Sequence, residues 1–149
     1  MLQPNRPLTL LLIDDDPAVV RLLKAIIEKT LSGQLEIESL TDPAAAQTRI
    51  EQGGVDILLT DLEMPGVNGL ELLRSAKRRN AYTQVLFLTG HSEQDALLEA
   101  LEQGATDYLL KPVDHGQLLE LVSQAYARQK RWQQALAGTW RQQEEAAAP

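Results

Sequence analysis

Residues 10–17, LLLIDDDP, decide the fold of this chain, because they join an apolar run directly to three consecutive carboxylates. The aliphatic residues 8–13 have the length and continuous apolarity of a strand that is covered on both faces. Adjacent carboxylates at the end of such a strand repel one another and lose solvation, so a metal ion or a basic side chain has to compensate them. Asp16 precedes Pro17, which is typical of a helix cap, whereas Asp14 and Asp15 alone are equally compatible with turn residues.

The same alternation of apolar runs and polar segments continues along the chain. Further strands are predicted over residues 55–60, 85–89 and 108–110, with a weaker one over 35–40. Amphipathic segments of helical length separate them. Helix starts with capping residues are predicted at Asp42 before Pro43, Ser92 with Asp95, and Asp114 with Gln117. The order predicts an α/β fold of five strand–helix pairs around a mostly parallel sheet.

The composition limits the class of protein. A length of 149 residues fits one domain, and 44% apolar residues with only 4% aromatics predict a core of Leu, Ile, Val and Ala. The net charge of −7 argues against direct binding of nucleic acid. Residues 128–149 contain four bases and two acids, which leaves a charge of −9 on residues 1–127.

The absence of cysteine suits a reducing compartment, and we expect a cytoplasmic protein. The apolar run after Arg6 is too short for a signal peptide and ends in aspartates rather than small residues. No stretch reaches the length of a transmembrane helix, so no membrane contact is expected.

Five polar residues follow the predicted strands at the edge where parallel strands end. Asp14 and Asp15 follow the first strand, Asp61 the third, Thr89 the fourth and Lys111 the fifth. Ligands gather at this edge of a parallel sheet. Carboxylates without a cysteine or clustered histidines favour Mg²⁺ over zinc, and adding a lysine and a threonine hydroxyl completes a set suited to phosphoryl transfer. A carboxylate is then a candidate nucleophile.

From residue 8 to about residue 127 the chain resembles the response-regulator receiver domain of bacterial two-component signalling and phosphorelays. Four motifs in the order and spacing of that family establish the resemblance: LLIDDDP (11–17), DILLTDLEMPGVNGLELL (56–73), VLFLTGH (85–91) and GATDYLLKPVD (104–114). The resemblance implies a flavodoxin-like, doubly wound sheet of five parallel strands in the order 2-1-3-4-5 with five helices. It also implies a cis peptide bond between Lys111 and Pro112.

By that resemblance, Asp61 is the phosphoacceptor of a sensor histidine kinase, a phosphotransfer protein or a small phosphodonor. The implied cofactor is Mg²⁺, bound directly by Asp15 and Asp61, through water by Asp14, and by the backbone carbonyl of Glu63. Thr89 and Lys111 are then the residues that contact the phosphoryl oxygens.

The resemblance further implies a switch in which Thr89 moves toward the phosphoryl group and Tyr108 changes rotamer. The signal would leave through the surface of the fourth helix, fifth strand and fifth helix, toward a downstream protein or output domain. Such a domain assists only its own phosphorylation and dephosphorylation and is not otherwise an enzyme. Glu63 and His91, two residues beyond Asp61 and Thr89, occupy positions that tune the lifetime of the phosphoryl group, and His91 is able to titrate near neutral pH.

Two other classes of function remain open on the residues. A phosphatase of the haloacid dehalogenase type would use Asp14 as nucleophile, with Asp14-x-Asp16 as a partial signature, but Ala18 stands where that family has Thr or Val. A receiver-fold module that binds partners without phosphorylation is the third hypothesis. The five site residues argue against it.

The last helix is predicted to continue beyond the receiver, which separates a domain of residues 1–127 from a helical extension of residues 128–149 with a disordered end. Its apolar stripe keeps steps of three and four over Leu118, Val122, Ala125, Gln129, Trp132, Leu136 and Trp140. We expect either a signalling helix or a fraying overhang. Homodimerisation is expected through this helix or through the face of the fourth helix, fifth strand and fifth helix.

Overall fold

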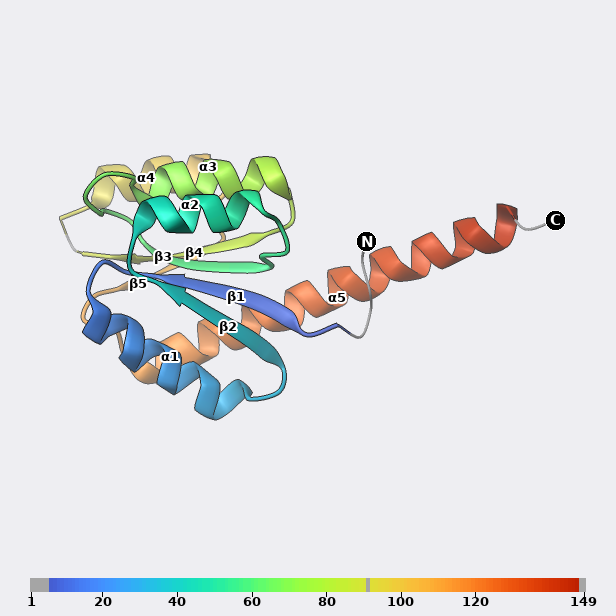
Figure 1. Ribbon diagram of the computed structural model, residues 1–149, viewed down its shortest axis with the longest axis horizontal. Helices are drawn as coiled ribbons and strands as arrows, with labels where there is room; N and C mark the ends of the chain where they lie inside the picture. Colours follow the sequence, from blue (N-terminus) through green and yellow to red (C-terminus); the bar gives the residue numbers. More distant parts are fainter. Residues whose placement is uncertain (1–5, 91, 148–149) are drawn as a thin grey trace.

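The computed structural model contains one sheet of five parallel strands in the order β2-β1-β3-β4-β5 (Figure 1). It describes residues 6–90 and 92–147, without the side chains of 139–145 and 147. The elements in chain order are β1 (Leu8–Ile13), α1 (Pro17–Leu31), β2 (Leu35–Leu40), α2 (Pro43–Glu51), β3 (Ile57–Asp61), α3 (Gly69–Arg79), β4 (Gln84–Thr89), α4 (Gln94–Glu102), β5 (Asp107–Leu110) and α5 (His115–Ala147). The doubly wound fold class and the strand order were predicted correctly, and so was the cis bond before Pro112.

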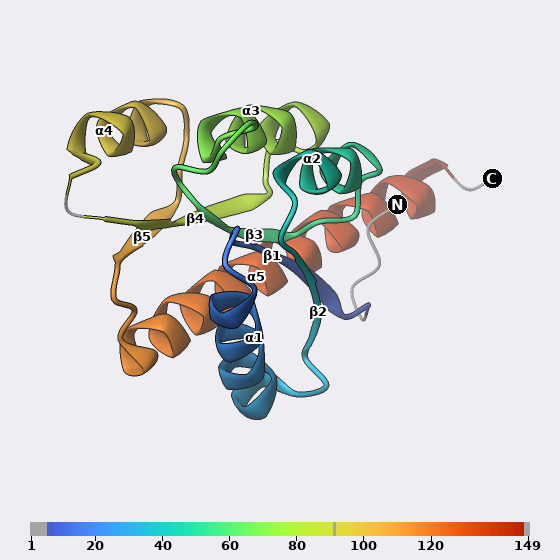
Figure 2. The ribbon, with the colours of Figure 1, turned by 60° about the vertical axis from the view of Figure 1, so that its left-hand side comes forward.

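Each strand of the sheet sends alternate side chains to opposite faces, and both faces are covered (Figure 2). Leu10 and Leu12 of β1 belong to a core shared with α1 and α5. Leu11 and Ile13 of the same strand belong to a second core shared with α2, α3 and α4. All four side chains are fully buried, which explains why β1 has a continuous apolar run rather than an alternating one.

The predicted caps are right at three helices and wrong at the fourth. Carboxylates of Asp16, Asp42 and Asp114 accept hydrogen bonds from backbone N–H groups at the starts of α1, α2 and α5. Helix α4 instead begins at Gln94 with Glu93 in the cap position, and no side chain caps its first turn. The predicted Ser92 cap is therefore incorrect, because the helix begins one residue later and the Glu93 side chain bonds to Thr89 instead of capping the first turn.

Helix α5 crosses the face of the sheet beside α1 and then continues past the body of the domain (Figures 1 and 2). Gln84, the first residue of β4, fixes the helix where it leaves. Its side-chain amide donates to the carbonyl of Ala125 at 2.7 Å and to Oε1 of Gln129 at 2.9 Å, and its own Oε1 accepts from Nε of Arg128 at 3.0 Å. The helix is continuous across residue 127, and the predicted domain boundary there remains a prediction.

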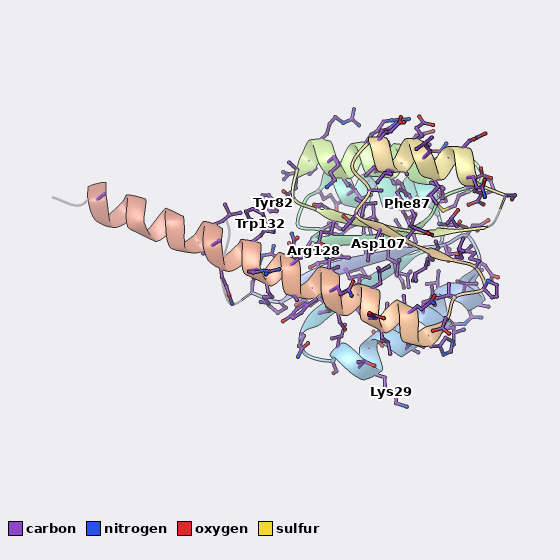
Figure 3. All side chains as sticks on the ribbon, turned by 180° about the vertical axis from the view of Figure 1, so that it is seen from behind. Lys29, Tyr82, Phe87, Asp107, Arg128 and Trp132 are labelled. Carbon is purple, nitrogen blue, oxygen red and sulfur yellow. The ribbon has the colours of Figure 1, made fainter. Side chains whose placement is uncertain are left out.

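The predicted apolar stripe of α5 holds only through its first half. Gln129, a polar member of the stripe, is buried, but Trp132 is 58% exposed where the helix leaves the body (Figure 3). Among the side chains of the extension that the structure describes, those buried beyond Gln129 are Gln133 and Ala137, which continue from Gln129 in steps of four. The side chain of Trp140 lies outside the described residues. Among the described residues, no helix is long and apolar enough to cross a lipid bilayer.

Candidate functional site: an acidic cluster at the carboxyl edge of the sheet

Three carboxylates from two neighbouring strands meet at the carboxyl edge of the sheet. Asp14 and Asp15 follow β1, and Asp61 is the last residue of β3. One carboxylate oxygen from each residue lies within 4.8 Å of the others. Asp14 and Asp61 are buried, whereas Asp15 is exposed and opens the cluster to solvent. The structure therefore brings together the three carboxylates that the sequence placed at this edge.

The ammonium group of Lys111 bridges the two buried carboxylates. Its Nζ lies 3.1 Å from Oδ2 of Asp14 and 3.0 Å from Oδ2 of Asp61. Partial burial lowers the pKa of Lys111, but the hydrogen bonds with the two carboxylates outweigh it, so the net pKa is raised. Lys111 stays charged at neutral pH and compensates part of the negative charge.

Asp61 lies in a tightly packed surrounding. A Cβ on Gly69, the first residue of α3, would lie 2.5 Å from the backbone oxygen of Asp61 and 2.8 Å from the ring of Phe87. Only glycine lets α3 begin this close to the end of β3. Burial raises the pKa of Asp61, and the ammonium group of Lys111 opposes the shift only in part. The site therefore favours a further cation.

The donor set fits Mg²⁺. Three carboxylates supply hard oxygen ligands from one small region, and the exposed position of Asp15 leaves room for water and a phosphoryl oxygen. Asp14 already accepts from the backbone N–H of Asp16 at 2.9 Å and from Lys111. Both carboxylate oxygens of Asp14 are therefore already hydrogen-bonded.

The hydroxyl of Thr89 lies at the same edge but bonds away from the acidic cluster. Thr89 Oγ1 donates to Oε2 of Glu93 at 2.6 Å, and the same oxygen accepts from the backbone N–H of Gly90 at 3.1 Å. The Thr89 backbone carbonyl accepts from the N–H of Lys111 at 2.9 Å, which links the ends of β4 and β5. Sequence reasoning missed Glu93; its place four residues after Thr89 in a loop was the available signal.

Tyr108 lines an apolar groove between α4 and β5 and is 45% exposed. Leu98 and Leu101 of α4 line the same groove and are 57% and 67% exposed. Glu63 is exposed in the loop after Asp61. His91 lies outside the described residues.

Comparison with known proteins agrees with this site and fold. The model of the response regulator receiver domain matches residues 10–123, and the chain belongs to this family. Receiver domains are regulatory switches of two-component signalling. The chain is 34% identical over 123 residues to the DNA-binding transcriptional regulator NtrC of Escherichia coli, which is 82% of this chain and 25% of NtrC. It is 35% identical over 119 residues to the transcriptional regulatory protein FixJ of Azorhizobium caulinodans, 78% of this chain and 54% of FixJ.

Solved structures show the same fold. A receiver domain from Clostridium thermocellum superposes with a TM-score of 0.75 at 28% identity, covering 84% of this chain and 98% of that chain. A CheY-like receiver from Methanospirillum hungatei gives a TM-score of 0.77 at 27% identity, covering 85% and 98%. The chain thus spans nearly all of these solved receivers, but about a quarter of NtrC and about half of FixJ. The family match therefore favours a receiver over a phosphatase of the haloacid dehalogenase type.

Proposed function

We propose that this chain is a phosphorylation-dependent switch in which the carboxylate of Asp61 accepts a phosphoryl group. The observation that supports this most directly is the geometry of Asp61, which is buried at the end of β3, bonded to Lys111 and within 4.8 Å of two further carboxylates. Burial raises the pKa of Asp61 and makes its ionised form costly, and Lys111 offsets that cost only in part, so chemistry performed there best explains its position.

In the proposed reaction, an oxygen of Asp61 attacks the phosphorus atom of a phosphohistidine or a small acyl phosphate. A new P–O bond forms, the bond to the donor breaks, and the donor leaves with that electron pair. The product is an acyl phosphate on Asp61. Hydrolysis by water later restores the carboxylate and releases inorganic phosphate.

Residues of the cluster have distinct parts in this reaction. Bound Mg²⁺ would neutralise charge that develops on the phosphoryl oxygens. Asp15 and Asp61 are the residues proposed to hold the ion directly, with Asp14 acting through water and the backbone carbonyl of Glu63 as a further ligand. Lys111 is already positioned at Asp61 and would pair with a phosphoryl oxygen.

The proposed output surface is formed by α4, β5 and α5. Its exposed apolar side chains, including Leu98, Leu101 and Tyr108, suit a protein partner or an output domain. The names of NtrC and FixJ describe transcriptional regulators, and a comparable output for this chain is a proposal. A histidine kinase or phosphotransfer protein is the proposed source of the phosphoryl group, and a homodimer through this surface or through α5 is a further proposal.

The direct test is incubation with acetyl phosphate and Mg²⁺, followed by mass spectrometry of the peptide that contains Asp61. We expect one added phosphoryl group, which is absent in Asp61→Asn and absent when EDTA replaces Mg²⁺. Asp16→Asn is the matched control, because it removes a neighbouring charge but keeps a residue able to cap α1. If acetyl phosphate does not phosphorylate Asp61 and beryllofluoride does not bind, the results would support the passive binding module instead.

A further inference from the structure

Glu93 contacts Thr89, a group at the carboxyl edge that is expected to move if Asp61 is phosphorylated. Its Oε2 accepts from the hydroxyl of Thr89 at 2.6 Å, a distance typical of a charge-assisted bond between a hydroxyl and a carboxylate. Thr89 is only 1% exposed and Glu93 is half-buried, so this bond is partly shielded from water. The hydroxyl has a single proton to donate. While it donates to Glu93, it is not available to an oxygen on Asp61.

Glu93 is also part of the start of α4. Its backbone carbonyl accepts from the N–H of Leu97 at 2.9 Å, the first hydrogen bond of the helix. A carboxyl side chain in this cap position commonly bonds the N–H groups of the first helical turn, but that of Glu93 reaches back to Thr89 and to the N–H of Gly90. One residue therefore joins the end of β4 to the beginning of α4.

We propose that Glu93 is a positioning residue that holds Thr89 in the resting state and opposes activation of the site. This inference rests on the proposed function of Asp61. A phosphoryl group on Asp61 competes with Glu93 for the Thr89 hydroxyl. When Thr89 transfers its hydrogen bond, Oε2 of Glu93 keeps only the N–H of Gly90 as a donor, which weakens the link between β4 and the uncapped first turn of α4. Helix α4 carries the exposed side chains of Leu98 and Leu101, so a change at its first turn reaches the proposed output surface directly.

The test is a double-mutant cycle on beryllofluoride affinity in the full chain with Mg²⁺, followed by the backbone NMR signals of Gly90 and α4. Glu93→Ala removes the competing acceptor and is expected to tighten beryllofluoride binding about tenfold, the equivalent of about 1.4 kcal/mol. In a Thr89→Val background the competition no longer exists. There, Glu93→Ala is expected to change the affinity by less than about twofold.

Two further variants separate the hydrogen bond from the charge. Glu93→Gln keeps an oxygen acceptor without the negative charge, so its effect should lie between those of the wild type and Glu93→Ala. Glu99→Ala removes a carboxylate of α4 that pairs with Arg74 at 3.4 Å, and should leave the affinity unchanged within about twofold.

The outcomes separate the role of Glu93 from the proposed function of Asp61. Equal tightening by Glu93→Ala with and without the Thr89 hydroxyl would show a charge effect alone and would overturn the role of Glu93. Weaker binding in Glu93→Ala would overturn it as well. If wild type shows no response to beryllofluoride, or the same response as Asp61→Asn, the proposed function fails, and the role of Glu93 fails with it.

Discussion

Replacement of Asp15 by Asn should change the stability of the protein in opposite directions without and with Mg²⁺. Asp15 is the exposed member of the carboxylate cluster, so its substitution disturbs little packing. Without metal, the variant loses a charge that two nearby carboxylates repel. With metal, it loses a charged ligand. Neutralising a residue of the metal site should therefore stabilise the protein without Mg²⁺ and destabilise it with Mg²⁺.

The size of the effect follows from the geometry. Two unit charges 4.8 Å apart repel by about 0.9 kcal/mol in water and about 3.5 kcal/mol at an effective dielectric constant of 20. Because Asp15 is exposed, the lower value applies, and repulsion from Asp14 and Asp61 sums to about 2 kcal/mol. The ammonium group of Lys111, which bridges Asp14 and Asp61, is one positive charge against these two negative charges and offsets about half of the repulsion, so Asp15→Asn should gain about 1 kcal/mol without metal.

With free Mg²⁺ a hundredfold above its dissociation constant, the wild type gains about 2.7 kcal/mol. A variant that no longer binds the ion is then the less stable one by about 2 kcal/mol. Urea unfolding at constant ionic strength, in EDTA and in Mg²⁺, measures both values. Asp16→Asn should show the full gain from Mg²⁺. If Asp15→Asn is less stable than the wild type in EDTA, or if it keeps the whole gain in stability from Mg²⁺, Asp15 is not a charged ligand of the ion.

Three further outcomes are expected. Lys111→Met leaves the carboxylates of Asp14 and Asp61 without their bridging cation and should cost about 2 kcal/mol in EDTA, less in Mg²⁺, by urea unfolding. Gln84→Ala removes three hydrogen bonds to α5 and should cost about 2 kcal/mol, with faster hydrogen exchange in residues 125–133 and an unchanged response to Mg²⁺. Because burial raises the pKa of Asp61, the folded state binds that proton more tightly than the unfolded state. Asp61→Asn in EDTA should therefore stabilise the protein at neutral pH, and urea unfolding should show this advantage disappear as the pH falls from the raised pKa of Asp61 to its lower pKa in the unfolded chain.

The fold was predictable from the sequence because strands covered on both faces have to be continuously apolar. The predicted and observed bounds of β1 are the same, Leu8–Ile13. The start of β3 was predicted two residues early, at Val55, and begins at Ile57. Asp56 precedes the strand with its side chain turned to Arg6, at 2.7 Å, and to the backbone N–H of Thr9. Asp56 is separated from Arg6 by 50 positions and from Thr9 by 47 positions in the sequence, so no local pattern reveals these two contacts.

Burial in the extension of α5 likewise depends on a contact with a residue far away in the sequence. Hydropathy favoured Trp132 as a buried residue, yet the structure buries Gln129 and exposes the tryptophan. Gln129 is buried because its side chain accepts a hydrogen bond from Gln84, which is 45 residues earlier in the sequence. A polar side chain is accommodated in a buried position when such a partner exists. The identity of that partner depends on the tertiary fold.

The composition of the site was predictable, whereas the resting contacts of its members were not. Parallel topology alone brings Asp14, Asp61, Thr89 and Lys111 to one edge. The bond from Thr89 to Glu93 depends on the path of the loop between β4 and α4, and the expected Ser92 cap assumed a different path. Site residues are thus more predictable from topology than the conformational state in which they are held.

Strand β4 connects the start of α4 with the part of α5 that leaves the body of the domain. Its last residue, Thr89, bonds to Glu93 at the start of α4, and its first residue, Gln84, bonds to α5 at the opposite edge of the sheet. All six residues between and including these ends are buried, so the strand has little freedom to deform. A hydroxyl that turns at Thr89 therefore acts on α4 directly, and α5 keeps its contacts with Gln84. The chemical shifts of α4 should accordingly change on addition of beryllofluoride, while those of residues 125–129 stay nearly constant. Large shifts confined to the α5 extension would contradict this order of coupling.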